Sequence, residues 1–267
     1  MTAQNSSFSD LKQRVMSAAG LLIVMVFSLM MGGLFFTTFL GGCTAVLTLE
    51  LCQVTTQNLR RKNAANIILI CLTFLIPVSN HFSYATIYLV AAALIICSVE
   101  KTGRWIRLLG VVYISLAVVC VQEIFFSSNS KNGFVELLFI GVVVFSTDIG
   151  AYFSGRTFGG PRLWSRISPN KTWSGLLGGI ILSIIFGYLY VFIVDKNFVN
   201  ILIFCLILSS ASQIGDLAQS SVKRFYGAKD SGIILPGHGG LFDRFDGLLA
   251  AVLTYYFFGH FLGVGIW

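Results

Sequence analysis

Charged residues are scarce in this chain, because they make up 11% of its 267 residues while hydrophobic residues make up 56%. Soluble globular domains contain about 25% charged residues, so this composition excludes an ordinary soluble domain. The mean hydropathy is +0.84, and apolar runs of the roughly 20 residues that cross a bilayer fill most of the chain. We therefore expect an all-α polytopic integral membrane protein, folded as a single membrane-embedded domain over residues 1–267.

Several motifs for metal and nucleotide binding are also absent. None of the six cysteines belongs to a C-x-x-C pair, and all lie in apolar runs, which argues against a disulfide framework or a zinc site. Neither G-x-x-x-x-G-K-[ST] nor G-x-G-x-x-G occurs, so a Walker A loop and a dinucleotide fingerprint are excluded. No small-residue cleavage site follows a short apolar region, so we expect the first apolar segment to be a retained helix.

The apolar segments predict about nine transmembrane helices. The Gly32-Gly33 pair interrupts an apolar stretch too long for one span, which indicates a tight connection between the first two helices. The spacing Gly175-x-x-x-Gly179 would allow close helix packing. The predicted spans cover residues 15–31, 34–53, 64–80, 83–99, 106–124, 134–153, 174–194, 198–215 and 245–265.

The basic residues predict the orientation of these spans. With a cytoplasmic N-terminus, sixteen of the eighteen Lys and Arg residues fall in cytoplasmic segments, and only Lys131 and Lys196 do not. The C-terminus then lies on the opposite side. The net charge of +7 thus reflects topology and does not indicate nucleic-acid binding. Two cytoplasmic loops, at residues 154–173 and 216–244, are long and polar, and such loops often carry function.

Acidic residues gather at the second of these loops. Asp216 and Asp243 lie at the membrane ends of two adjacent predicted spans, where they can hold Mg²⁺, a cation that prefers oxygen ligands. Asp246 lies one helical turn after Asp243 and can face the same cleft. Asp148, near the cytoplasmic end of another span, is a further candidate metal ligand. The alternative is that these acids form structural ion pairs with nearby basic residues.

The same loop carries a cluster of cations. Lys223, Arg224 and Lys229 are candidates for a phosphate clamp, since Arg offers a bidentate fork and Lys a mobile charge. The alternative is that each of these residues only reflects the excess of basic residues on the cytoplasmic side of a membrane protein. Ser220 is a candidate hydrogen-bond donor to phosphate.

Two further segments are typical of phosphate contact. His238 lies between glycines, either as a general base or as a donor to phosphate, and Gly239 and Gly240 would let the backbone approach a nucleotide. A plain turn is the alternative there. Residues 168–173 resemble a phosphate-binding loop that leads into a helix, and the candidate substrate-binding residues in it are Ser168, Lys171 and Thr172.

Two acids lie inside predicted spans. Glu50 and Glu136 are expected to pair with polar partners in the helix bundle, because an unpaired carboxylate within a membrane is costly. The sequence does not place either of them at the site.

Residues 220–246 resemble the signature of CDP-diacylglycerol synthases, also called phosphatidate cytidylyltransferases, at every fixed position. Residues 148–152, 168–173 and 215–217 resemble other motifs of that family. Ile149 stands where a small or hydroxyl residue is common, and Gln219 stands where a Glu is frequent. With Gln219 in place of a Glu, this region carries one negative charge fewer.

The resemblance implies the Mg²⁺-dependent reaction CTP + phosphatidate → CDP-diacylglycerol + pyrophosphate, catalysed by a homodimer in the bilayer of a bacterial inner membrane, on its cytoplasmic face. It also implies that Asp216 and Asp243 bind the metal, with K⁺ as a candidate second ion. Asp246, Lys223 and Arg224 complete the expected catalytic set. A CTP-dependent lipid kinase is the alternative enzyme, and a cation transporter is the alternative from another class.

Overall fold

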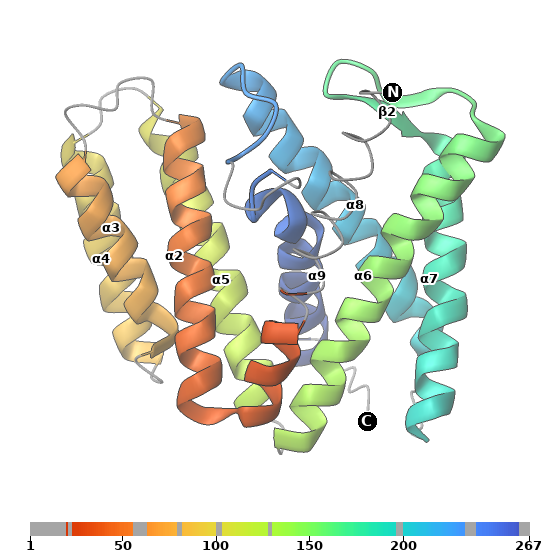
Figure 1. Ribbon diagram of the computed structural model, residues 1–267, viewed down its shortest axis with the longest axis horizontal. Coiled ribbons are helices and arrows are strands. Elements are labelled where there is room, and N and C mark those ends of the chain that lie inside the picture. The colour runs from red at the N-terminus through yellow and green to blue at the C-terminus, as the bar shows by residue number, and fades with distance from the viewer. Residues whose placement is uncertain are drawn as a thin grey trace, which may run out of the picture. The chain divides into compact units, whose positions relative to one another are not determined.

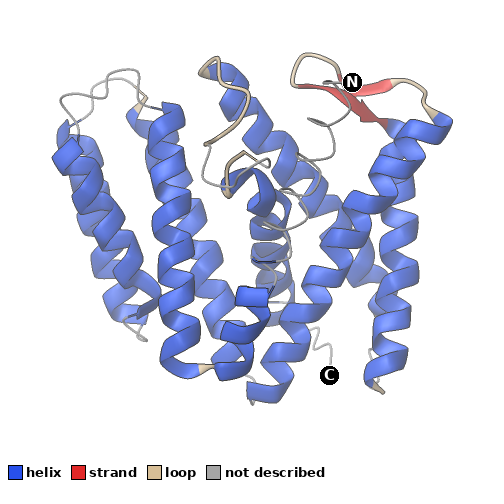
Figure 2. Cartoon of the chain, viewed as in Figure 1, coloured by secondary structure: helices blue, strands red, loops and turns tan. Residues whose placement is uncertain are grey.

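The computed structural model describes residues 20, 23–55, 63–78, 82–99, 103–127, 130–195, 200–232 and 239–261. It divides into two compact units. The first unit comprises residues 1–122 and 226–244, and the second comprises residues 123–225 and 245–267. Both units are built mainly of helices, which Figure 1 labels in chain order and Figure 2 distinguishes from strands and loops.

The first unit contains a group of helices with a break at a glycine pair. Its helices are α2 (Gly33–Thr55), α3 (Asn63–Val78), α4 (Phe82–Val99) and most of α5 (Arg104–Ser127). A helical segment at residues 23–31 precedes α2. Gly32 and Gly33 have φ angles of 60° and 48°, a conformation that glycine adopts readily. The interruption predicted at this pair is therefore confirmed.

Small residues let the helices of the first unit pack closely. A Cβ atom on Gly41 of α2 would lie 2.8 Å from the carbonyl oxygen of Phe74 in α3. Helix α5 is joined to the end of α2 by a buried hydrogen bond of 2.9 Å, in which Arg107 Nε donates to Thr55 Oγ1. Any larger side chain at Gly41 would separate α2 from α3.

The second unit holds the remaining elements. They are α6 (Ser130–Phe158), the strands β1 (Arg162–Trp164) and β2 (Ser168–Thr172), α7 (Trp173–Val194), α8 (Ile201–Phe225) and most of α9 (Phe242–Phe261). Helix α7 packs on α6 through glycines: a Cβ on Gly175 would lie 2.9 Å from the Ala151 oxygen, and one on Gly179 would lie 2.8 Å from the Thr147 oxygen. The close packing predicted from the Gly175-x-x-x-Gly179 spacing is confirmed.

Within the part of the chain that the structure describes, five helices are long and apolar enough to cross a membrane, namely α2, α5, α6, α7 and α8. Helix α7 leaves large apolar side chains outside the fold, with Phe192 and Ile193 exposed by 83% and 70%. Such surface is unfavourable in water and fits contact with lipid. The chain is therefore a mainly helical integral membrane protein.

The structure corrects the expected extent of both polar loops. Helix α8 runs to Phe225, ten residues beyond the predicted span end at residue 215, because no glycine or proline occurs between Gly215 and Gly227. Helix α6 likewise continues to Phe158. The segment after it forms the antiparallel hairpin β1–β2, which the expectation of an all-α protein did not include (Figure 2).

Candidate active site

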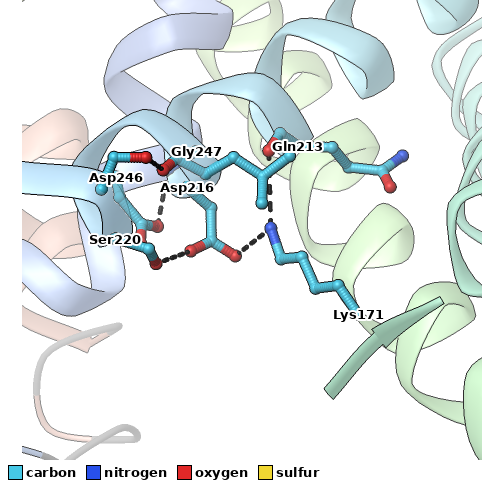
Figure 3. Close-up of polar contacts among 8 residues, drawn as sticks. Lys171, Gln213, Asp216, Ser220, Asp246 and Gly247 are labelled. Atoms are coloured by element: carbon cyan, nitrogen blue, oxygen red, sulfur yellow. Dashed lines mark hydrogen bonds and ion pairs between the residues drawn. The ribbon is translucent and has the colours of Figure 1, made fainter. Parts of the chain in front are cut away.

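Asp216 is the centre of a polar cluster in the second unit (Figure 3). Its Oδ2 atom lies 2.6 Å from Lys171 Nζ, and its Oδ1 atom accepts a hydrogen bond of 3.2 Å from Ser220 Oγ. Ser220 is on the same face of α8, one turn further along. The structure thus brings together three residues that the sequence predicted for the site.

Lys171 reaches α8 from the last part of strand β2. Its Nζ atom also donates to the backbone oxygen of Gln213 at 3.4 Å, so it spans one turn of α8 (Figure 3). The Lys171 and Asp216 side chains are 25% and 36% exposed. A pair with that exposure remains accessible to water, phosphate and ions.

Asp246 adds a second carboxylate beside Asp216 (Figure 3). It interacts electrostatically with Asp216, Asp148 and Lys223. Its Oδ1 atom also accepts a hydrogen bond of 2.7 Å from the amide of Gly247. Three carboxylates near two lysines leave an excess of negative charge that favours a bound cation.

Gly215 explains how the two carboxylates come together. A Cβ atom at this position would lie 2.6 Å from Ala250 Cβ and 2.8 Å from the Asp246 backbone oxygen. Only glycine lets α9 approach α8 so closely, which places Asp246 next to the residue that follows Gly215.

The hairpin is held by capping and by one arginine. Thr172 is the N-cap of α7, and its Oγ1 accepts a hydrogen bond of 3.1 Å from the Gly175 amide. Arg224 Nε donates to the Ile167 oxygen in the hairpin turn at 3.4 Å. Ser168 lies at the start of β2, opposite Trp164. These contacts position the strand that carries Lys171.

Asp243 lies in the first unit, in the first turn of α9. Its Oδ2 atom accepts hydrogen bonds from the amides of Ser231 at 2.9 Å and Gly240 at 3.2 Å. The carboxylate therefore closes the turn that precedes α9. Lys229 is exposed two residues before Ser231, and His238 lies outside the described residues.

Gly239 and Gly240, just before α9, each have a structural role. Gly239 has a φ of 83°, which requires glycine. A Cβ on Gly240 would overlap Ser231 Oγ and lie 2.7 Å from Glu50 Oε2. Gly240 therefore lies close to protein atoms, and its approach to a nucleotide stays a prediction.

Glu50 is the residue of this region that sequence reasoning missed. It is fully buried in α2 and accepts three hydrogen bonds from the segment around Asp243. Its location inside an apolar span did indicate that it needs polar partners. Its partners are 181 to 192 residues away in sequence, which no local pattern reveals.

The carboxylates of the second unit fit Mg²⁺. Among the described residues, no three His, Cys, Asp or Glu side chains converge into a complete metal site. Mg²⁺ commonly takes one or two carboxylates and fills its other positions with water and substrate phosphates. Asp216 and Asp246, with oxygen ligands only and partial exposure, meet that requirement. Joint binding by Asp216 and Asp243 stays a prediction.

Comparison with known proteins identifies the family. Residues 12–262 match the model of a family described as the cytidylyltransferase family. The chain belongs to this family. Phosphatidate cytidylyltransferase from Bacillus subtilis (strain 168) is 32% identical to this family member over 261 residues, which cover 93% of the chain and 97% of the relative.

Two other relatives match this cytidylyltransferase family member over shorter segments. Phosphatidate cytidylyltransferase from Brucella suis biovar 1 is 44% identical over 174 residues, and the chain covers 64% of its length. The protein of the same name from Staphylococcus haemolyticus is 46% identical over 138 residues, or 53% of its length.

Replacing Lys171 by Met should separate activity from stability in this cytidylyltransferase family member. The ion pair with Asp216 is partly exposed, and such pairs contribute only about 0–1 kcal/mol to stability. We expect a nearly unchanged melting temperature and a fall in kcat/KM of about 10- to 100-fold, as for the loss of a charge-assisted contact. Steady-state kinetics and thermal unfolding in detergent measure both. Lys171→Arg keeps the charge and should retain more activity; equal kinetics for Lys171→Met and the parent would contradict a role in catalysis.

Proposed function

We propose that this chain is a phosphatidate cytidylyltransferase, which transfers the cytidylyl group of CTP to phosphatidate. The observation that carries the proposal is the Lys171–Asp216–Ser220 cluster, with Asp246 beside it, in a family member that spans membranes. Its similarity to the Bacillus subtilis protein over nearly the whole chain supports the same substrate pair.

The reaction needs little help from a base. A phosphate monoester has a second pKa of roughly 6, so the phosphatidate phosphate is already an anion near neutral pH. One of its oxygens attacks the α-phosphorus of CTP and forms a new P–O–P linkage. The bond between the α-phosphorus and the oxygen that bridges it to the β-phosphorus breaks. Pyrophosphate leaves with that electron pair. Because an anion attacks a polyanion, the site must neutralise charge and align the reactants.

The charged residues near Asp216 have separate roles in this reaction. Lys171 and Lys223 supply positive charge beside the carboxylates, where phosphate oxygens would lie. Arg224 holds the hairpin turn through Nε, and its guanidinium has further donors for phosphate. Asp216 and Asp246 would hold Mg²⁺, which when bound neutralises phosphate charge and orients the leaving group. Asp243 is the further proposed ligand.

The location of the reaction follows from the substrates and the distribution of charge. We propose nine spans with a cytoplasmic N-terminus, so that the C-terminus lies on the other side and the polar segments face CTP in the cytoplasm. Phosphatidate would reach the site from the inner leaflet of a bacterial inner membrane. Assembly as a homodimer is part of the same proposal.

Label transfer tests the function. Purified protein with phosphatidate, Mg²⁺ and CTP labelled at the α-phosphorus should give a labelled lipid and unlabelled pyrophosphate. Lipid labelled only from γ-labelled CTP would identify a lipid kinase and refute the proposal. Cation flux in liposomes without CTP turnover would identify a transporter instead.

A further inference from the structure

Glu50 is a fully buried carboxylate that the proposed chemistry does not use. It lies in α2, while the groups it binds lie about 190 residues later in the same unit. Its Oε1 atom accepts the Leu241 amide at 2.9 Å, and its Oε2 atom accepts the Phe242 amide at 2.7 Å. Oε2 also accepts Ser231 Oγ at 3.2 Å. Both oxygens are therefore engaged by one short segment.

These contacts place a negative charge at the start of α9. Phe242 is the first residue of that helix, and the first amides of a helix have no partner within it. A carboxylate there satisfies them and interacts favourably with the helix dipole. Glu50 thus caps α9 from another helix.

The segment is built around this carboxylate. A Cβ on Gly232 would lie 2.8 Å from Glu50 Oε1, and a Cβ on Gly240 would lie 2.7 Å from Glu50 Oε2. Ser231 uses its hydroxyl for Glu50 and its amide for Asp243. The same few residues therefore fix Glu50 on one side and Asp243 on the other.

We infer that Glu50 is a positioning residue, which holds Ser231, Gly232 and residues 239–243, the described part of the turn before α9, in the geometry that presents Asp243 to its ligand. The inference rests on the proposed function, because it takes Asp243 as a metal-binding residue. Glu50 acts through the turn and touches neither substrate nor metal. A glutamate is needed because both oxygens accept; glutamine would put an amide donor opposite a backbone N–H, and aspartate would be one methylene short.

Glu50→Gln is the decisive variant, and Glu136→Gln is its matched control. Glu136 is also a buried glutamate in a long apolar helix, and it is hydrogen-bonded to Tyr255 instead. Purified full-length protein is examined for amide hydrogen exchange at Leu241 and Phe242, for Mn²⁺ binding by electron paramagnetic resonance, and for cytidylyl transfer.

In Glu50→Gln, we expect the Leu241 and Phe242 amides to exchange at least about 10-fold faster. We expect its Mn²⁺ affinity and its kcat/KM to fall about 10- to 100-fold, as for the loss of charge-assisted hydrogen bonds. Glu136→Gln should leave the exchange and Mn²⁺ affinity unchanged. Wild-type Mn²⁺ affinity and kcat/KM in Glu50→Gln would overturn the inference, even if exchange were faster, since Glu50 would then support the fold alone.

Two further arms keep the result interpretable. If Glu50→Gln cannot be purified, Ser231→Ala removes one of the three hydrogen bonds and keeps the Ser231 amide, so the same changes should appear at smaller amplitude; unchanged Mn²⁺ affinity there would overturn the inference. Absence of cytidylyl transfer by the wild type would refute the proposed function, whereas Mn²⁺ binding and exchange would still test Glu50.

Discussion

Asp216→Asn is expected to abolish nearly all cytidylyl transfer while the protein still folds. The variant keeps the shape of the side chain and its hydrogen bond from Ser220, but it removes the charge that pairs with Lys171 and that we propose also binds Mg²⁺. Losing one electrostatic element of a preorganised site costs on the order of 10²–10³-fold in kcat. Initial rates with saturating CTP and phosphatidate measure the effect, with thermal unfolding to verify the fold.

Asp195→Asn is the matched control for this charge removal. Asp195 ends α7 with a φ of 52°, a conformation that asparagine also tolerates, and it is exposed. Its activity should equal that of the parent. If Asp216→Asn turns over at a near-normal rate, Asp216 does not hold the metal.

Asp243→Asn is expected to have a comparable effect on turnover but to leave the turn before α9 intact. An asparagine oxygen can still accept the Ser231 and Gly240 amides that Asp243 Oδ2 accepts, so the backbone geometry is retained while the charge is lost. We expect kcat to fall on the order of 10²–10³-fold with little change in amide exchange at Ser231 and Gly240.

The contrast with Glu50→Gln gives this prediction its discriminating power. One variant removes a charge and keeps the turn, whereas the other loosens the turn and keeps Asp243. Full activity in Asp243→Asn would reduce Asp243 to a structural cap. Faster exchange in that variant would instead show that its charge is needed to hold the turn.

The sequence predicted the features that depend on local composition. Apolar runs located α2 to α9 to within a few residues at most ends, since hydrophobic length determines a span. The Gly32-Gly33 break and the Gly175-x-x-x-Gly179 contact were predicted for the same reason, because small residues act through their immediate backbone. The grouping of Lys171, Asp216 and Ser220 followed from their chemistry and from the placement of both polar loops on one face of the membrane, and its geometry came from the structure.

Features that depend on distant contacts were not predictable. The polar end of α8 looked like a loop because charge was taken as the end of the span, although helix propensity continues to Phe225. Gly240 packs closely against Glu50, a residue distant in the sequence, so no local pattern could predict this contact. The capping of α7 by the Thr172 hydroxyl was also not predicted, and contact between Thr172 and substrate stays a prediction.

The contact between Glu50 and α9 also sets an order of events during synthesis. Ribosomes add about 5–20 residues per second, so Glu50 is synthesised roughly 10–40 s before Leu241 and Phe242. During that interval its carboxylate needs another hydrogen-bond partner, such as water at the insertion site. The nascent chain therefore passes through a stage in which α2 lies in the bilayer without the Leu241 and Phe242 amides that later bind Glu50, and insertion of α9 ends that stage. Truncations before residue 241 should consequently be cleared by membrane quality control more readily than truncations after α9.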